Sequence, residues 1–127
     1  MLPGHDVTAL LGQGGMGYVY RARQASLRRD VAAKVALTTS SDAEETERFF
    51  REAQVLAQLD HPNIVPIYDF GRNRDGGLYY TMKLVRGMTL TAILVQMREG
   101  TARWSREALL EVFRKVCDAV DFAHSRG

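Results

Sequence analysis

Residues 11–20 decide the fold, and they read Leu-Gly-Gln-Gly-Gly-Met-Gly-Tyr-Val-Tyr. Gly12, Gly14 and Gly17 fit G-x-G-x-x-G, a pattern in which backbone N–H groups can approach the oxygens of a polyphosphate. The pattern alone is weak evidence, because a flexible turn or a dinucleotide-binding fold can carry it. A dinucleotide-binding fold needs the glycines to open a helix, with an acidic residue about 20 positions further on. Gly17 instead runs into an alternating segment and Asp30 follows a turn, so the glycines are predicted to join two strands.

Strand-like alternation continues on both sides of this link. Three strands are predicted, over residues 7–11, 18–23 and 31–37, and their tight links indicate an antiparallel meander. In the third strand two sets of residues face opposite sides: Val31, Ala33, Val35 and Leu37 on one, and Ala32, Lys34 and Ala36 on the other. Two further strands are predicted over residues 64–70 and 78–85, joined by a turn at residues 73–77 that is rich in Asn, Asp and Gly.

Three helices are predicted as well. The first begins at a capping box of Ser41 and Glu44 and ends near Leu59, ahead of Pro62. From Thr89 the period becomes helical again, with a short helix up to about residue 100 and a longer one that begins after Ser105. The longer helix has an apolar stripe of Leu109, Val112, Phe113, Val116, Val120 and Ala123. The change from strands to helices predicts two lobes, residues 1–86 and 87–127.

Composition and charge limit the class of protein. Apolar residues make up 46% and charged residues 25% of the 127 residues, an ordinary globular balance. A net charge of +2 is too even to indicate nucleic acid or an anionic membrane as partner. No stretch approaches the roughly 20 apolar residues that cross a bilayer, and the first residues do not resemble a signal peptide. The single cysteine, Cys117, is predicted to be packed and inert, and we expect a cytoplasmic protein.

Two charged residues stand where apolar ones are expected. Lys34 shares a strand face with two alanines, so its ammonium needs an anion or water. On a helical wheel Glu52 falls inside the apolar stripe of the first helix, among Phe49, Ala53 and Leu56. A carboxylate in that position is costly unless it is paired, and Lys34 is a candidate partner. A lysine that is held by a glutamate beside a glycine-rich loop can bind phosphate groups.

At this point the chain resembles the N-terminal lobe of protein kinases, most closely the bacterial serine/threonine kinases of eukaryotic type. Four matching elements stand in family order: residues 11–20, Val31-Ala32-Ala33-Lys34, Arg51-Glu52-Ala53 and His61-Pro62-Asn63-Ile64-Val65. The resemblance implies an α+β fold, with a five-stranded antiparallel sheet, one packed helix and two helices of an incomplete helical C-terminal lobe.

The resemblance also implies a binding site for ATP. Lys34 would contact the α and β phosphates, and Glu52 would orient Lys34. The glycine loop would cover the triphosphate, the adenine would lie between apolar side chains, Met82 would be the gatekeeper at the back of the pocket, and the next three residues would be the hinge. The implied binding residues are Leu11, Gly12, Gln13, Gly14, Gly15, Met16, Gly17, Tyr18, Val19, Ala32, Lys34, Met82, Lys83, Leu84 and Val85.

Other parts of the family's machinery have no counterpart in these 127 residues. No His-Arg-Asp sequence follows His124, so the catalytic base and the metal-binding Asn of the family are not matched. Asp69-Phe70-Gly71 spells the family's magnesium motif but lies too early, and it is interpreted as a turn at a strand end. We therefore expect ATP binding without phosphotransfer, no metal site, and Mg²⁺ only in a full-length parent that phosphorylates serine or threonine of protein substrates.

A second hypothesis comes from a different class of protein. The long helix carries apolar residues that need a partner, so residues 89–127 could form a homo-oligomer in a non-catalytic interaction module. Titration with ATP distinguishes the two hypotheses, because a pure interaction module would not respond to the nucleotide.

Overall fold

A computed structural model describes residues 2–14, 17–37, 42–101 and 103–127. The chain divides into two compact units. The first contains Met1–Asp60 and Val65–Leu84, and the second contains His61–Ile64 and Val85–Gly127. The lobe boundary that we place at residue 86 stays a prediction.

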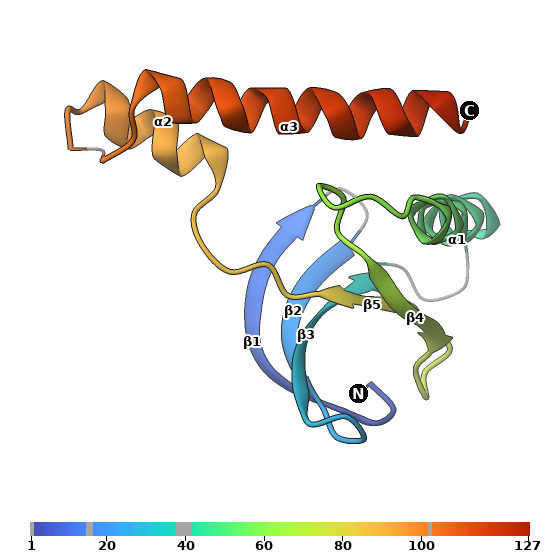
Figure 1. The fold of residues 1–127 in the computed structure, drawn as a ribbon. Helices are drawn as coiled ribbons and strands as arrows, with labels where there is room; N and C mark the ends of the chain where they lie inside the picture. Colours follow the sequence, from blue (N-terminus) through green and yellow to red (C-terminus); the bar gives the residue numbers. More distant parts are fainter. Residues whose placement is uncertain (1, 15–16, 38–41, 102) are drawn as a thin grey trace. The chain divides into compact units, whose positions relative to one another are not determined.

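The first unit is built on an antiparallel sheet of five strands in the order β1-β2-β3-β5-β4 (Figure 1). The strands are β1 (His5–Gly14), β2 (Gly17–Gln24), β3 (Arg29–Ala36), β4 (Ile67–Arg72) and β5 (Leu78–Lys83). The first three form the predicted meander, and β4 and β5 form the predicted hairpin. Its turn is closed by Asn73, whose side-chain oxygen accepts hydrogen bonds from the N–H groups of Asp75 and Gly77.

Two strand assignments made from the sequence are wrong in detail. The strand predicted from Ile64 begins at Ile67, because the N–H of Ile64 donates to the oxygen of His61 in a turn and Pro66 has no N–H to contribute to a ladder. The segment Asp69-Phe70-Gly71 is not a turn at a strand end but lies inside β4, where all three residues pair with β5. It follows a register shift between Ile67 and Asp69.

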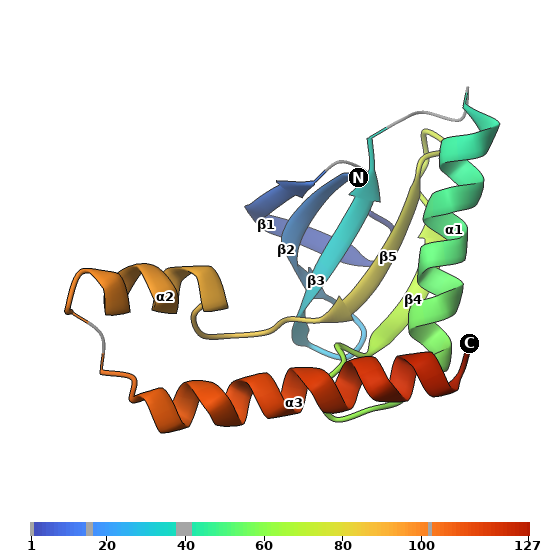
Figure 2. The same ribbon diagram turned by 90° about the horizontal axis from the view of Figure 1, so that it is seen from above.

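The single helix of this unit, α1 (Ala43–Gln58), contacts β4 and β5 and runs along the sheet beside them (Figure 2). Its N-cap is Asp42, whose side chain accepts hydrogen bonds from the N–H groups of Glu44 and Glu45. The predicted capping box is therefore corrected by one residue, and Ser41 itself lies outside the described residues. Either residue type can cap a helix, and the carboxylate also complements the positive end of the helix dipole. The helix ends as predicted, with Leu59 as its C-cap.

The two faces of the sheet have separate apolar clusters, as the alternation in β3 predicts. One contains Val31, Ala33 and Val35 with Ala22, Leu2 and Tyr79. The other lies between the opposite face and α1, and contains Phe49, Ala53, Leu78 and Tyr80, with Ala36 and Met82 partly buried against it. This second face is the one on which Lys34 stands, so α1 is packed where its Glu52 can meet Lys34.

The second unit contains two capped helices, α2 (Leu90–Arg98) and α3 (Arg106–Ser125). Thr89 and Ser105 are their N-caps, and each side chain accepts a hydrogen bond from a backbone N–H. Gly100 ends α2 with φ of 73°, and hydrogen bonds from Gly100 and Thr101 back to Met97 and Gln96 complete the expected C-terminal turn. The amide of Asn63 donates to the backbone oxygen of Lys115, which ties the segment after α1 to α3.

Half of the apolar stripe predicted for α3 is exposed, whereas Leu109, Val112 and Ala123 are half-buried. Phe113 is 65% exposed, and Leu110, Val116 and Val120 are also exposed on the same side of the helix. Cys117 lies among them and is exposed, so the prediction that it is packed and inert is corrected. The periodicity identifies an apolar stripe, but it does not say what covers it.

Candidate functional site

An ion pair joins the sheet to the helix. Lys34 comes from β3 and Glu52 from α1, and the Lys34 Nζ lies 2.7 Å from the Glu52 Oε1. The side chains are 19% and 33% exposed, so the pair is shielded from bulk water without being sealed from it. The helical wheel predicts this pairing because Phe49 and Ala53 fix which side of α1 faces the sheet, and both are buried. The pair is confirmed, and its role stays a prediction.

A third residue completes the pair. The hydroxyl of Tyr80, on β5, donates a hydrogen bond of 2.6 Å to the same Oε1 of Glu52 that accepts from Lys34. Burial raises the pKa of Glu52, but the hydrogen bonds from Lys34 and Tyr80 outweigh it, and the pKa ends below its usual value of 4.5. Burial and the bond to Glu52 raise the pKa of Tyr80 far above 10.0, so the hydroxyl keeps its proton. The sequence analysis missed Tyr80.

The glycine segment lies on the same face of the sheet as the ion pair. Gly12 pairs with Val19, Val19 with Lys34, and Lys34 with Tyr80, and residues directly opposite one another in antiparallel strands share a face. One row of side chains therefore crosses the sheet from the glycine segment to the lysine and the tyrosine. A neighbouring row pairs Arg21 with Ala32 and Ala32 with Met82.

The glycines join β1 to β2 as a hairpin and do not open a helix, which excludes the dinucleotide-binding fold. Gly14 and Gly17 are the last described pair of this hairpin, and Gly15 and Met16 lie outside the described residues. A Cβ placed on Gly12 or Gly14 would meet nothing within 4 Å, whereas a Cβ on Gly17 would lie 2.1 Å from the backbone oxygen of Val35. Among the three described glycines of this hairpin, packing requires glycine at position 17 and not at 12 or 14, and the surface over Gly12 and Gly14 is open.

Asp30, the acidic residue considered for a dinucleotide site, is paired with two arginines. Asp30 forms an ion pair of 2.6 Å with Arg21 and a longer one of 3.3 Å with Arg23. Hydrogen bonds from Arg21 and then Arg23 hold the pKa of Asp30 below its usual value of 3.8. Asp30 therefore stabilises the β2–β3 hairpin as a carboxylate.

The other predicted binding residues are distributed along the same strands. Leu11 is exposed and lies at a register shift in β1, and Ala32 is buried in β3. Gln13 and Tyr18 pair with each other, in line with Val35 on the face away from Lys34. Met82 and Lys83 end β5 and Leu84 follows, whereas Val85 belongs to the second unit.

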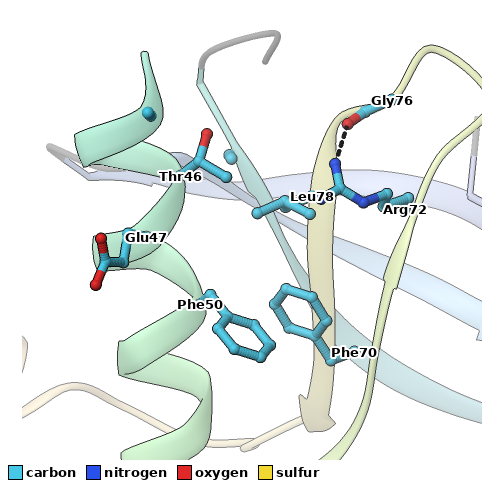
Figure 3. Close-up of a pocket in the computed structure, with 9 residues that line it drawn as sticks. Thr46, Glu47, Phe50, Phe70, Arg72, Gly76 and Leu78 are labelled. Atoms are coloured by element: carbon cyan, nitrogen blue, oxygen red, sulfur yellow. Dashed lines mark hydrogen bonds between the residues drawn. The ribbon is translucent and has the colours of Figure 1, made fainter. Parts of the chain in front are cut away.

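The structure also has a cavity that the sequence analysis did not predict. It is about 560 Å³ in volume and lies between the first half of α1 and the β4–β5 hairpin (Figure 3). The rings of Phe50 and Phe70 meet edge to face in it, 5.0 Å apart, and Arg72 donates to the oxygen of Gly76 at its rim. Neither Lys34 nor Glu52 lines it, so it is separate from the ion pair.

No group of three or more His, Cys, Asp or Glu side chains is arranged to hold a metal ion in the described part of the chain. In the same residues no helix has the length and apolar character needed to span a bilayer.

Comparisons with known proteins agree with this geometry. Residues 5–127 match the protein kinase domain family. The chain is 41% identical over 124 residues to the serine/threonine-protein kinase pkn3 of Myxococcus xanthus, covering 97% of this chain and 22% of that protein. It is 35% identical over 131 residues to the serine/threonine-protein kinase PknD of Chlamydia caviae, covering 97% of this chain and 14% of that protein.

The fold agrees with a solved kinase. The crystal structure of the Mycobacterium tuberculosis PknI kinase domain matches all of this chain and 50% of its own, with a TM-score of 0.71 and 31% identity. The chain thus spans half of that solved kinase domain and a smaller share of the curated relatives. It therefore belongs to the protein kinase family, and its fold is that of the N-terminal lobe and the start of the C-terminal lobe of a bacterial serine/threonine kinase.

Proposed function

We propose that this chain binds ATP on the sheet face that carries Lys34, as the nucleotide-holding part of a serine/threonine protein kinase. One observation carries the proposal: the ammonium of Lys34, held by Glu52, shares a face with a glycine hairpin over which two positions are open. A fixed cation and exposed backbone N–H groups are complementary to a polyphosphate.

The residues present fit the nucleotide. The triphosphate would lie against Gly12 and Gly14, where side-chain atoms are lacking and the backbone can approach closely. The adenine would contact the apolar side chains of Val19 and Ala32, with Met82 next to Ala32 in the same row. When bound, ATP supplies the phosphoryl group that kinases transfer, and the residues of this chain orient its phosphates.

Catalysis is assigned to the whole kinase and not to these residues by themselves. The described residues hold no cluster of metal-ligating side chains, and the sequence has no His-Arg-Asp motif. We propose that residues 1–127 bind the nucleotide weakly and largely without metal, and that transfer to serine or threonine of a protein substrate needs further residues of the kinase. Lys34 and Glu52 would then act as catalytic residues of the complete site.

Titration with an ATP analogue that carries a fluorescent group on its ribose tests the binding. Lys34→Met removes the ammonium and keeps much of the side-chain volume, and we expect the affinity to fall about tenfold or more, as for loss of one charge-assisted contact. Lys115→Met is the matched control, because Lys115 is an exposed lysine of α3, and its affinity should equal that of the unchanged chain. Equal affinity of the Lys34→Met chain would remove Lys34 from the site.

A further inference from the structure

We infer that Tyr80 is a positioning residue of this site, whose hydroxyl holds the Glu52 carboxylate against the sheet and thereby keeps Lys34 directed along the nucleotide-binding face. The inference rests on the proposed function for its consequence in binding. Its structural part, that Tyr80 controls the Glu52–Lys34 pair, can be tested without a nucleotide.

The geometry brings three groups to one atom. The Tyr80 hydroxyl and the Lys34 ammonium lie 2.6 and 2.7 Å from the same Oε1 of Glu52. Tyr80 stands directly opposite Lys34 in the pairing of β5 with β3, and the Lys34 Nζ lies 6.0 Å from the centre of the tyrosine ring. The hydroxyl is therefore placed by the register of two central strands and not by a flexible loop.

The ring of Tyr80 is buried and packs against α1. Tyr80 is 2% exposed, and its ring centre lies 5.2 Å from that of Phe49. Phe49 precedes Glu52 by three residues, so both lie on the side of α1 that faces the sheet. Tyr80 thus contacts α1 through its ring and through its hydroxyl, and it fixes both the position of the helix and the direction of the carboxylate.

The Tyr80 hydroxyl also lowers the free-energy cost of moving the Lys34 ammonium from Glu52 towards a phosphate. Moving the ammonium away from Glu52 would leave a partly buried carboxylate without its cation, which is unfavourable. With the Tyr80 hydroxyl still bonded to Oε1, the carboxylate keeps a donor while Lys34 is shared with the ligand. Without the hydroxyl, Glu52 competes more strongly for Lys34 and is freer to turn towards solvent.

Among the described residues of the first unit, Lys34 and Tyr80 are the groups that act most directly on this carboxylate. Lys34 from β3 and Tyr80 from β5 are the titratable groups that hydrogen-bond to it. On α1 the neighbouring Arg48 and Arg51 form ion pairs with Glu44 and Glu47. The pH dependence of stability in the acid range therefore reports on the Tyr80–Glu52 bond through a small and defined set of partners.

The test compares Tyr80→Phe with Tyr79→Phe, which loses the same hydroxyl from the adjacent residue on the opposite face of the sheet. Urea unfolding of each 127-residue chain is measured from neutral to acid pH. Glu52 stabilises the fold as a carboxylate, and this contribution is lost as the pH falls through its folded pKa. Tyr80→Phe should move that loss to higher pH, and Tyr79→Phe should leave it in place.

Two outcomes overturn the inference at this stage. A loss of stability in Tyr80→Phe that is the same at every pH would mean that the hydroxyl only packs or hydrogen-bonds without acting on the carboxylate. If Tyr80→Phe still moves the pH at which stability is lost when it is added to Glu52→Gln, another group causes the effect.

Nucleotide titration then tests the consequence for binding. Tyr80→Phe should lower the affinity for the fluorescent ATP analogue by about three- to tenfold, the range expected for loss of one ordinary hydrogen bond that acts on the nucleotide only through Glu52 and Lys34. The same substitution in a Glu52→Gln chain should have no further effect. Unchanged affinity of Tyr80→Phe would overturn the positioning role. If the unchanged chain does not bind the analogue at all, the proposed function fails. The pH dependence of unfolding in acid then decides by itself whether Tyr80 controls Glu52.

Discussion

The glycines of the hairpin meet two different physical demands. Gly17 is needed by the sheet itself, because any Cβ there would collide with the backbone oxygen of Val35 on the neighbouring strand. Gly12 and Gly14 have no such neighbour among the described residues, and neither adopts a positive φ, so the packing that the structure describes does not require glycine at either position. We propose that their lack of side chains allows a ligand to approach the backbone.

Alanine substitutions separate these demands. Gly17→Ala should destabilise the chain by about 1–3 kcal/mol, since the atom it meets belongs to the backbone and cannot rotate away. Gly14→Ala should change stability by about 0.5 kcal/mol or less and should weaken nucleotide binding. Urea unfolding and titration with the ATP analogue measure the two effects. A Gly14→Ala chain that binds as well as the unchanged one would argue against phosphate at this position.

Residue by residue, the sequence predicts the site only in part. The alternation in β3 and the helical wheel of α1 are local patterns, and together they bring Lys34 to Glu52. Tyr80 could not be found in this way, because its place opposite Lys34 depends on the pairing of β5 with β3, strands separated by a helix and another strand. The sequence did contain one signal, because Tyr80 lies in a predicted strand. The apolar ring of a tyrosine there predicts burial, and a buried hydroxyl needs a hydrogen-bond partner.

At the scale of the element, α1 matters most because it carries Glu52. Its stripe of Phe49 and Ala53 is buried against the sheet, and the rings of Phe49 and Tyr80 are in contact. The sequence predicts the end of this helix, but the cap predicted at Ser41 is one residue too early. Ser41 and Asp42 are both good N-caps, so local propensity cannot choose between them, and Asp42 caps the helix.

The cap leads to a prediction for α1. Asp42→Ala removes the acceptor for the N–H groups of Glu44 and Glu45 and should lower the free energy of unfolding by about 1 kcal/mol. Asp60→Ala is the control, because Asp60 follows the other end of the helix, where a negative charge is unfavourable, and its loss should not destabilise the chain. Urea unfolding at neutral pH compares them. Equal stability of the two variants would contradict the assignment of Asp42 as the cap.

At the scale of the whole molecule, apolar surface is distributed unevenly between the two units. The sheet has an apolar cluster on each face. In the second unit, α3 has an exposed apolar stripe, formed by Leu110, Phe113, Val116 and Val120, each of which is at least 46% exposed. Sequence periodicity predicts that such a stripe is buried, but what buries it lies outside any local pattern, and for this reason the prediction for Cys117 failed.

The exposed stripe predicts that the isolated chain associates with itself. Light scattering at rising concentration should give a mass above the 14.3 kDa of one chain, because contact between stripes removes apolar surface from water. Phe113→Ser should reduce the association, whereas Leu27→Ser, at an equally exposed leucine of the first unit, should not. A constant mass of one chain at every concentration would show that the stripe does not drive association.

We propose that ATP binds to the sheet face between the glycine hairpin and the Lys34–Glu52–Tyr80 cluster. Amide chemical shifts of the isotope-labelled chain, recorded by nuclear magnetic resonance during titration with ATP, test it most directly. We expect the largest changes at Gly12, Gly14, Val19 and Lys34, and small ones at the separate cavity between α1 and the β4–β5 hairpin. Changes confined to the residues of that cavity, such as Phe50 and Gly76, would contradict it.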